Sequence, residues 1–343
     1  MNKETLRQLY KNKSLRKRVL VVLVIMAAYS LLSQIPVPVP DTAKLQIFLA
    51  KIFQSSSLLG FVNLFSGGAL SRFSILLMGL GPYINASIII QLLTQVVPKL
   101  KDLSKEGEAG TNKINYYTRL LTLPLAIVQA VAMVFLVRNL STQSLGIDLI
   151  GSPNIFQWVL MVSTIVAGSM LLMWFGEIIT EKGVGNGVSM LIFAGIVANI
   201  PTRVSAMILS GNSNNSGMFA LFAIISLGML IAVVLFTDAH RLIPITYANQ
   251  GSGRGVSGGL PIRLNQAGMV PIIFAISLIT LPAIMAQFLQ TAPRFQGVVA
   301  FITTYFNAQN PSYPYIVAYF LLVLVFTFFY VSVTFKPADL AES

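Results

Sequence analysis

Few side chains in this sequence could carry acid–base, nucleophilic or metal chemistry. The chain has one histidine, His240, and no cysteine, so disulfides, thiolate metal sites and cysteine nucleophiles are excluded. Its 11 aspartates and glutamates lie outside the long apolar segments or at their edges. A nucleophile paired with a base, or a cluster of metal ligands, is therefore hard to assemble. We expect no enzymatic activity and no cofactor.

The elements that would position any site are apolar helices in a membrane. Hydrophobic residues make up 55% of the 343 residues, charged residues make up 10%, and the mean hydropathy is +0.77. A soluble chain of this composition would have too little polar surface. A bilayer core of about 30 Å needs roughly 20 apolar residues per helix. Segments near this length predict an all-α polytopic protein with eight transmembrane spans at 19–36, 74–97, 119–137, 155–176, 185–205, 218–237, 266–289 and 314–335.

The distribution of cations predicts the orientation of these spans. Seventeen of the 23 Lys and Arg residues fall on the side that carries the N-terminus. By the positive-inside rule this side is cytoplasmic, as is the end of the sequence. Residues 1–18 then form a basic cytosolic N-terminus, followed by an N-terminal half at 19–205 and a C-terminal half at 206–343.

The loop at 238–265 is the most distinctive cytoplasmic segment. It is dense in glycine and proline, and it carries Arg241, Arg254 and Arg263. One interpretation is a solvated loop that only obeys the charge rule. The other is a projecting finger whose guanidinium groups contact RNA phosphates or an acidic protein surface. Composition does not separate the two.

A ninth apolar stretch, around 47–70, does not read as a span. Ser55-Ser56-Ser57, Gly60 and Ser66-Gly67-Gly68 interrupt it. Such breaks are tolerated at membrane depth only where protein shields the backbone, so a short re-entrant element is predicted. Gly67 and Gly68 allow a helix to break, as a mobile segment requires, or allow two helices to pack closely.

Several long motifs resemble the SecY family of protein-translocation channels. The segment at 61–72 and the following 78–93 resemble its plug and second span, and Gly176-Glu-Ile-Ile-Thr-Glu-Lys-Gly-Val-Gly-Asn-Gly-Val-Ser189 resembles the connection between its fourth and fifth spans. The resemblance runs from about residue 15 to the last residue. It implies a pseudo-symmetric helical bundle around an hourglass pore. The remaining motifs lie at 105–108, 193–197, 265–275 and 334–341.

The resemblance implies two structures that close the pore. A re-entrant plug helix at about 61–72 would rest against the constriction until a substrate displaces it, and its named residues are Phe65, Ser66, Gly67, Gly68, Ala69, Leu70 and Arg72. A ring of aliphatic side chains would hold back ions because a narrow apolar constriction dewets. Its implied members are Leu80, Ile84, Val188, Ile192 and Ile273. Without the resemblance, pairs spaced by four residues would indicate ordinary core packing.

Two amides mark the implied lateral gate. Gln91 and Asn265 lie at the ends of the second and seventh spans, which flank this gate in the family. A hydrogen bond between them, worth about 0.6 kcal/mol in a membrane, could hold the gate shut. The alternative is a helix–helix contact without a gating role.

The implied function is a passive channel for Sec-dependent secretion of unfolded preproteins and lateral insertion of membrane-protein helices, in the bacterial plasma membrane. Energy would come from the SecA ATPase or a translating ribosome, and the subunits SecE and SecG would brace the helices. Signal peptides and nascent chains would pass through, and anionic lipids would contact the basic face. No GxxxxGK[ST] motif occurs in the sequence, consistent with an external motor.

Two other classes compete with this interpretation. A secondary transporter also uses broken helices, but it predicts buried ionisable residues for coupling. An intramembrane enzyme predicts a catalytic set inside the membrane. The placement of the acidic residues and the scarcity of His and Cys argue against both.

The length of the C-terminal half also leads to an expectation. SecY-like channels have two inverted repeats of five spans, whereas this sequence has five predicted spans followed by three. The sequence ends at Ser343, inside the cytoplasmic loop after the eighth span of the family. We expect a fragment rather than a shortened channel, because a half-built pore would expose polar groups such as Gln91 to lipid.

The orientation can be tested with introduced cysteines, since the chain has none of its own. Cysteines at Asn12 or Ser252 should resist a membrane-impermeant thiol reagent applied to intact cells. Cysteines at Ser213 or Gln296 should react. The reverse pattern would overturn the charge-based orientation.

Overall fold

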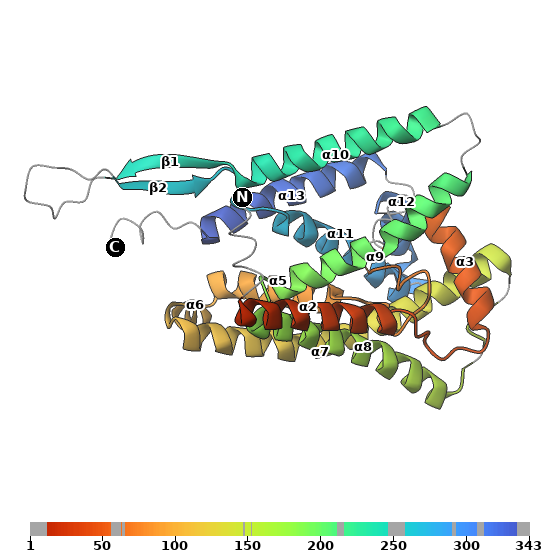
Figure 1. Cartoon of the computed structure of the whole chain (residues 1–343). Coiled ribbons are helices and arrows are strands. Elements are labelled where there is room, and N and C mark those ends of the chain that lie inside the picture. Colours follow the sequence, from red (N-terminus) through yellow and green to blue (C-terminus); the bar gives the residue numbers. More distant parts are fainter. Residues whose placement is uncertain are drawn as a thin grey trace, which may run out of the picture. The chain divides into compact units, whose positions relative to one another are not determined.

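A computed structural model of the chain describes residues 12–55, 63, 66–146, 148–151, 153–210, 216–245, 258–289, 293–306 and 312–334 (Figure 1). These residues belong to two compact units. The first comprises Met1–Arg203 and Ser277–Ala318, and the second comprises Val204–Ile276 and Tyr319–Ser343. Three helices, α9 (Gly187–Ser210), α11 (Val270–Leu289) and α13 (Tyr313–Thr334), contribute to both units.

The first unit is a bundle of helices. Contacts join α5 to α7, α7 to α8, and α2 to α8. The elements wholly within this unit are α2 (Lys13–Leu32), α3 (Thr42–Ser55), α5 (Gly81–Val96), α6 (Pro98–Lys105), α7 (Glu108–Leu145), α8 (Ile155–Lys182), the 3₁₀ turn η1 (Pro293–Phe295) and α12 (Gln296–Tyr305).

Each predicted span overlaps a helix. Within the described part of the chain, four helices are long and apolar enough to cross a membrane by length and composition, at Glu108–Thr142, Ile155–Lys182, Leu221–Asp238 and Tyr313–Ser332. The other four overlapping helices are α2, α5, α9 and α11. The helical class is confirmed, and the number of spans stays a prediction.

The second predicted span differs from the structure at its beginning. We predicted a helix from residue 74, but residues 75–80 form turns and α5 starts only at Gly81. Pro82 in the first turn favours this start, because proline lacks the N–H that an earlier helical turn would need. Phe73 has a positive φ of 48°. The chain therefore reverses through turns before α5 can form.

Two ion pairs involve α7, one with α8 and one with the connection between the two helices. Arg119 on α7 pairs with Glu177 on α8. At the other end, the Arg138 Nε lies 2.7 Å from a carboxylate oxygen of Asp148, in the connection between the helices. The other oxygen of Asp148 accepts bonds from two backbone N–H groups, of Ile150 and Gly151. These contacts fix the register of the two helices.

The second unit contains α10 (Ser216–Asp238) and a hairpin. Strands β1 (His240–Ile245) and β2 (Gly258–Arg263) pair antiparallel, with His240 opposite Arg263 and Leu242 opposite Pro261. The ribbon extends beyond the end of α10 (Figure 1). This short ribbon is the strand structure in the described part of the chain, which is otherwise helical as predicted. Its two prolines are tolerated because both strands are edges, where a missing N–H can face outward.

A close helix contact leads to a stability prediction. A Cβ added at Gly168 on α8 would overlap the carbonyl oxygen of Ile75, a backbone atom that cannot move aside cheaply. We expect Gly168→Ala to destabilise the folded protein by about 1–3 kcal/mol through overpacking. Thermal unfolding in detergent measures this loss.

The matched control is Gly228→Ala in α10, where nothing lies within 4 Å of the added Cβ. Alanine favours helix more than glycine does, so this variant should keep or slightly raise the unfolding temperature. Equal behaviour of the two variants would contradict the close contact at Gly168.

Candidate functional site

Of the predicted plug at 61–72, the structure describes Asn63, which is helical, and residues 66–72, which form consecutive turns, so the expected helix does not extend through 66–72. Gly67 and Gly68 have φ values of 66° and 79°, which end any right-handed helix at this point. Local hydrogen bonds hold the turns, among them Gly68 N–H to the Asn63 carbonyl at 2.8 Å and Arg72 N–H to the Gly68 carbonyl at 3.3 Å. Phe65 lies outside the described residues.

The end of this segment is joined to the chain that follows α2. The N–H of Val37 donates to the Phe73 carbonyl at 2.8 Å, and the N–H of Ile75 donates to the Ile35 carbonyl at 2.9 Å. The Gln46 amide of α3 donates to the Arg72 carbonyl at 2.9 Å. This end of the segment is therefore held both by backbone hydrogen bonds and by a side chain.

Four of the five predicted ring residues share one apolar cluster. Leu80 is buried in it, and Ile84, Val188 and Ile192 are half-buried and pack against it. Leu80 occupies the N-cap of α5, and the N–H of Ile84 donates to its carbonyl at 2.9 Å, so the pair spans the first turn. Ala69 of the plug is fully buried in the same cluster. The structure thus brings the plug and four ring candidates together.

The fifth ring candidate, Ile273, belongs to the second unit. It is half-buried in the first turn of α11, where its N–H donates to the Met269 carbonyl at 3.3 Å. Its membership of the ring stays a prediction.

The two predicted gate amides each have a local partner. Gln91 donates from Nε2 to the Ser87 hydroxyl at 3.1 Å, within α5. The side-chain oxygen of Asn265 accepts from the N–H of Gly268 at 2.9 Å. Both bonds are local, within residues 87–91 and 265–268. A hydrogen bond between the two amides that would hold the gate shut stays a prediction.

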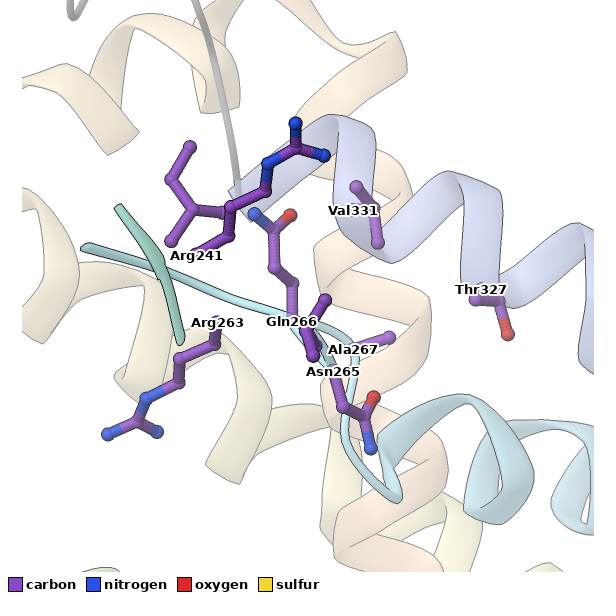
Figure 2. A pocket seen from close by; sticks show the side chains of 9 residues that line it. Arg241, Arg263, Asn265, Gln266, Ala267, Thr327 and Val331 are labelled. Atoms are coloured by element: carbon purple, nitrogen blue, oxygen red, sulfur yellow. The ribbon is translucent and has the colours of Figure 1, made fainter. Parts of the chain in front are cut away.

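Two of the three predicted docking arginines lie on the hairpin, and Arg254 lies outside the described residues. Arg241 and Arg263 line a cavity of about 360 Å³ at the base of the ribbon, together with Asn265, Gln266 and Thr327. Figure 2 shows that the two guanidinium groups point away from each other. They do not converge on one anion, so the pair suits an extended surface better than a single bound phosphate.

Three residues that contact the predicted plug received no role from the sequence, although one of them, Gly195, lies in the motif at 193–197. The Tyr29 hydroxyl of α2 donates to the Ser66 carbonyl at 3.1 Å in a buried position. Gly195 and Asn199 of α9 lie against Gly67 and Gly68. The rule that polar side chains inside apolar spans mark function, which singled out Gln91, would have found Asn199 as well.

The site and fold define a class. Apolar helices that enclose an aliphatic cluster, with a glycine-broken segment packed into it, are those of a polytopic membrane protein. The sequence profile of the SecY family matches residues 74–343. The protein translocase subunit SecY of Streptomyces galbus is 39% identical, over 97% of this chain and 77% of that relative. The chain belongs to the SecY family, and it is a protein-conducting channel subunit of a translocase.

Solved structures agree with this fold. Sec61 in the canine ribosome–channel complex from the endoplasmic reticulum matches with a TM-score of 0.61 at 18% identity, over 97% of this chain and 76% of that one. A SecY structure in which the plug domain stabilises the closed channel matches with a TM-score of 0.56 at 19% identity, over 82% of this chain and 60% of that one. At these identities the likeness concerns the fold.

Proposed function

We propose that this subunit forms the path for unfolded secretory proteins across the bacterial plasma membrane and releases apolar helices sideways into the lipid. The observation that carries the proposal is the cluster that joins Leu80, Ile84, Val188, Ile192 and the plug residue Ala69. Aliphatic side chains of this kind can exclude water at rest and can yield to a passing chain.

The closed state depends on two barriers in this proposal. The aliphatic ring resists ions because an ion at a dry constriction loses its hydration without gaining polar ligands. The plug fills the space beside the ring and adds a second seal. A translocating polypeptide displaces both, and neither step makes or breaks a covalent bond.

Sideways release would use the elements that carry Gln91 and Asn265. A hydrogen bond of about 0.6 kcal/mol between these amides is weak enough for an apolar signal helix to replace. After release, the apolar signal helix is surrounded by lipid, which is as apolar as the helix faces it contacted in the channel.

The partners follow from the same proposal. An external motor, the SecA ATPase or a ribosome, would dock on the cytoplasmic side through Arg241, Arg254 and Arg263, since guanidinium groups suit both phosphates and carboxylates. SecE and SecG would cover apolar helix faces, and anionic lipids would contact the basic N-terminus. In this orientation, the N-terminus and Ser343 are cytoplasmic.

Crosslinking to a translocation intermediate tests the path. A cysteine at Ile84 should form a disulfide with a cysteine in a secretory chain stalled by a folded domain at its end. The matched control is a cysteine at Tyr117, which is exposed on α7. Crosslinking at Tyr117 with none at Ile84 would place the path elsewhere.

The ring is tested by its resting seal. In Ile84→Asn the amide hydrates the constriction, so we expect resting ion leak and export of defective signal sequences to rise. The free energy of the closed state should change by about 1–3 kcal/mol, or roughly tenfold or more in open population. Conductance of proteoliposomes measures the leak. The control Ile84→Leu keeps an apolar side chain and should stay tight, and a tight Ile84→Asn channel would remove this residue from the ring.

A further inference from the structure

We infer that Tyr29, Gly195 and Asn199 form a latch that holds the Gly67-Gly68 turn of the plug in the resting channel. The inference deepens the proposed function, on which it rests. It assigns positioning roles to three residues that lie outside the plug and outside the aliphatic ring.

The first contact is a close approach of two glycines. A Cβ built on Gly195 would lie 3.1 Å from the Gly67 nitrogen and 3.2 Å from its Cα, both tighter than usual van der Waals contact. A Cβ on Gly67 would in turn overlap the Tyr29 hydroxyl. Only glycine at both positions lets the turn lie directly on α9. The two glycines therefore permit a close contact between this turn and α9 that larger residues would prevent.

The second contact is the hydrogen bond from Tyr29. Its hydroxyl donates to the Ser66 carbonyl at 3.1 Å, and the side chain is 4% exposed. The same carbonyl accepts from the N–H of Ala69 at 3.2 Å, so Tyr29 adds a second bond that comes from outside the segment. Removing the hydroxyl while keeping the ring should therefore weaken the seated turn by a factor of about two to ten.

The third contact is made by Asn199. Its Nδ2 donates to the Gly195 carbonyl at 2.9 Å, one turn earlier in α9, which fixes the direction of the amide. The amide oxygen then faces the plug, 2.9 Å from where a Cβ on Gly68 would lie. Tyr29 from α2 and Asn199 from α9 thus contact successive residues of the same turn.

The other hydrogen bonds of the segment hold its opposite end, so the latch acts on one end only. Residues Arg72 to Ile75 are fixed by Gln46 and by the backbone bonds to Ile35 and Val37. The hydrogen bond from Tyr29 and the close contacts of Gly195 and Asn199 all fall on the Ser66–Gly68 end. Release of the latch would free this end first, while the other end stays tied to α3 and to the chain after α2.

A thiol reporter measures release directly, because the chain has no native cysteine. Ala69→Cys places a single thiol at a position that is fully buried, beside the latch. In Tyr29→Phe and in Asn199→Ala, we expect a small thiol reagent to label this cysteine about two to ten times faster than in the parent. Tyr117→Phe, on the exposed face of α7, is the matched control and should leave the rate unchanged.

A second reporter separates local release from general loosening. Ala130→Cys is also fully buried, in the other core cluster, and should label at the parent rate in every variant. Unchanged labelling of Ala69→Cys in both latch variants, or equal acceleration at Ala130→Cys, would overturn the inference. The assay needs no motor and no substrate, so its result stands apart from the Ile84 crosslink that tests the proposed function.

Discussion

A backbone polar group inside a membrane needs a partner within the protein, and the rest of this structure depends on that requirement. Residues 66–80 form turns rather than a helix. Their N–H and C=O groups are therefore not all paired by the regular hydrogen bonds of a helix. The neighbouring segments supply bonds instead, from Tyr29, Gln46, Ile35 and Val37. The surrounding helices therefore separate the irregular segment from lipid and supply hydrogen bonds to its backbone.

The same requirement explains why small residues line the approach to this segment. Gly168 lets α8 reach the Ile75 carbonyl, and Gly195 lets α9 reach Gly67. Larger side chains would hold the helices away and leave space beside unpaired backbone groups. Close packing and backbone satisfaction are thus one constraint here, and the proposed function adds that the irregular element must also be displaced. A neutral hydrogen bond contributes only about 0.5–1.5 kcal/mol, which keeps that displacement accessible.

Sequence patterns predicted the features that depend on neighbouring residues in the chain, namely helices and breaks in helices. Runs of apolar residues placed a helix at each expected span, and Gly67-Gly68 predicted the break. The predicted start of the second span was wrong because hydropathy does not distinguish apolar turns from apolar helix. Pro82 indicated the later start of α5, and this signal was missed. Tyr29 and Ser66 are 37 residues apart, so no periodicity relates them. The predicted ring residues were named only through the family resemblance, since their spacing is that of any helix core.

In the proposed function, the position of the plug beside the aliphatic cluster resolves a conflict between sealing and opening. An apolar ring alone seals by dewetting, but its side chains have rotamer freedom and would leave gaps. Ala69 fills space in that cluster with little side-chain entropy to lose, while the adjacent turn carries the polar bonds that give it one position. Opening then separates small apolar surfaces and exchanges a few hydrogen bonds. A passing polypeptide can offer replacements for both, with aliphatic contacts for the ring and its own backbone for the turn, so the channel can open without an uncompensated cost.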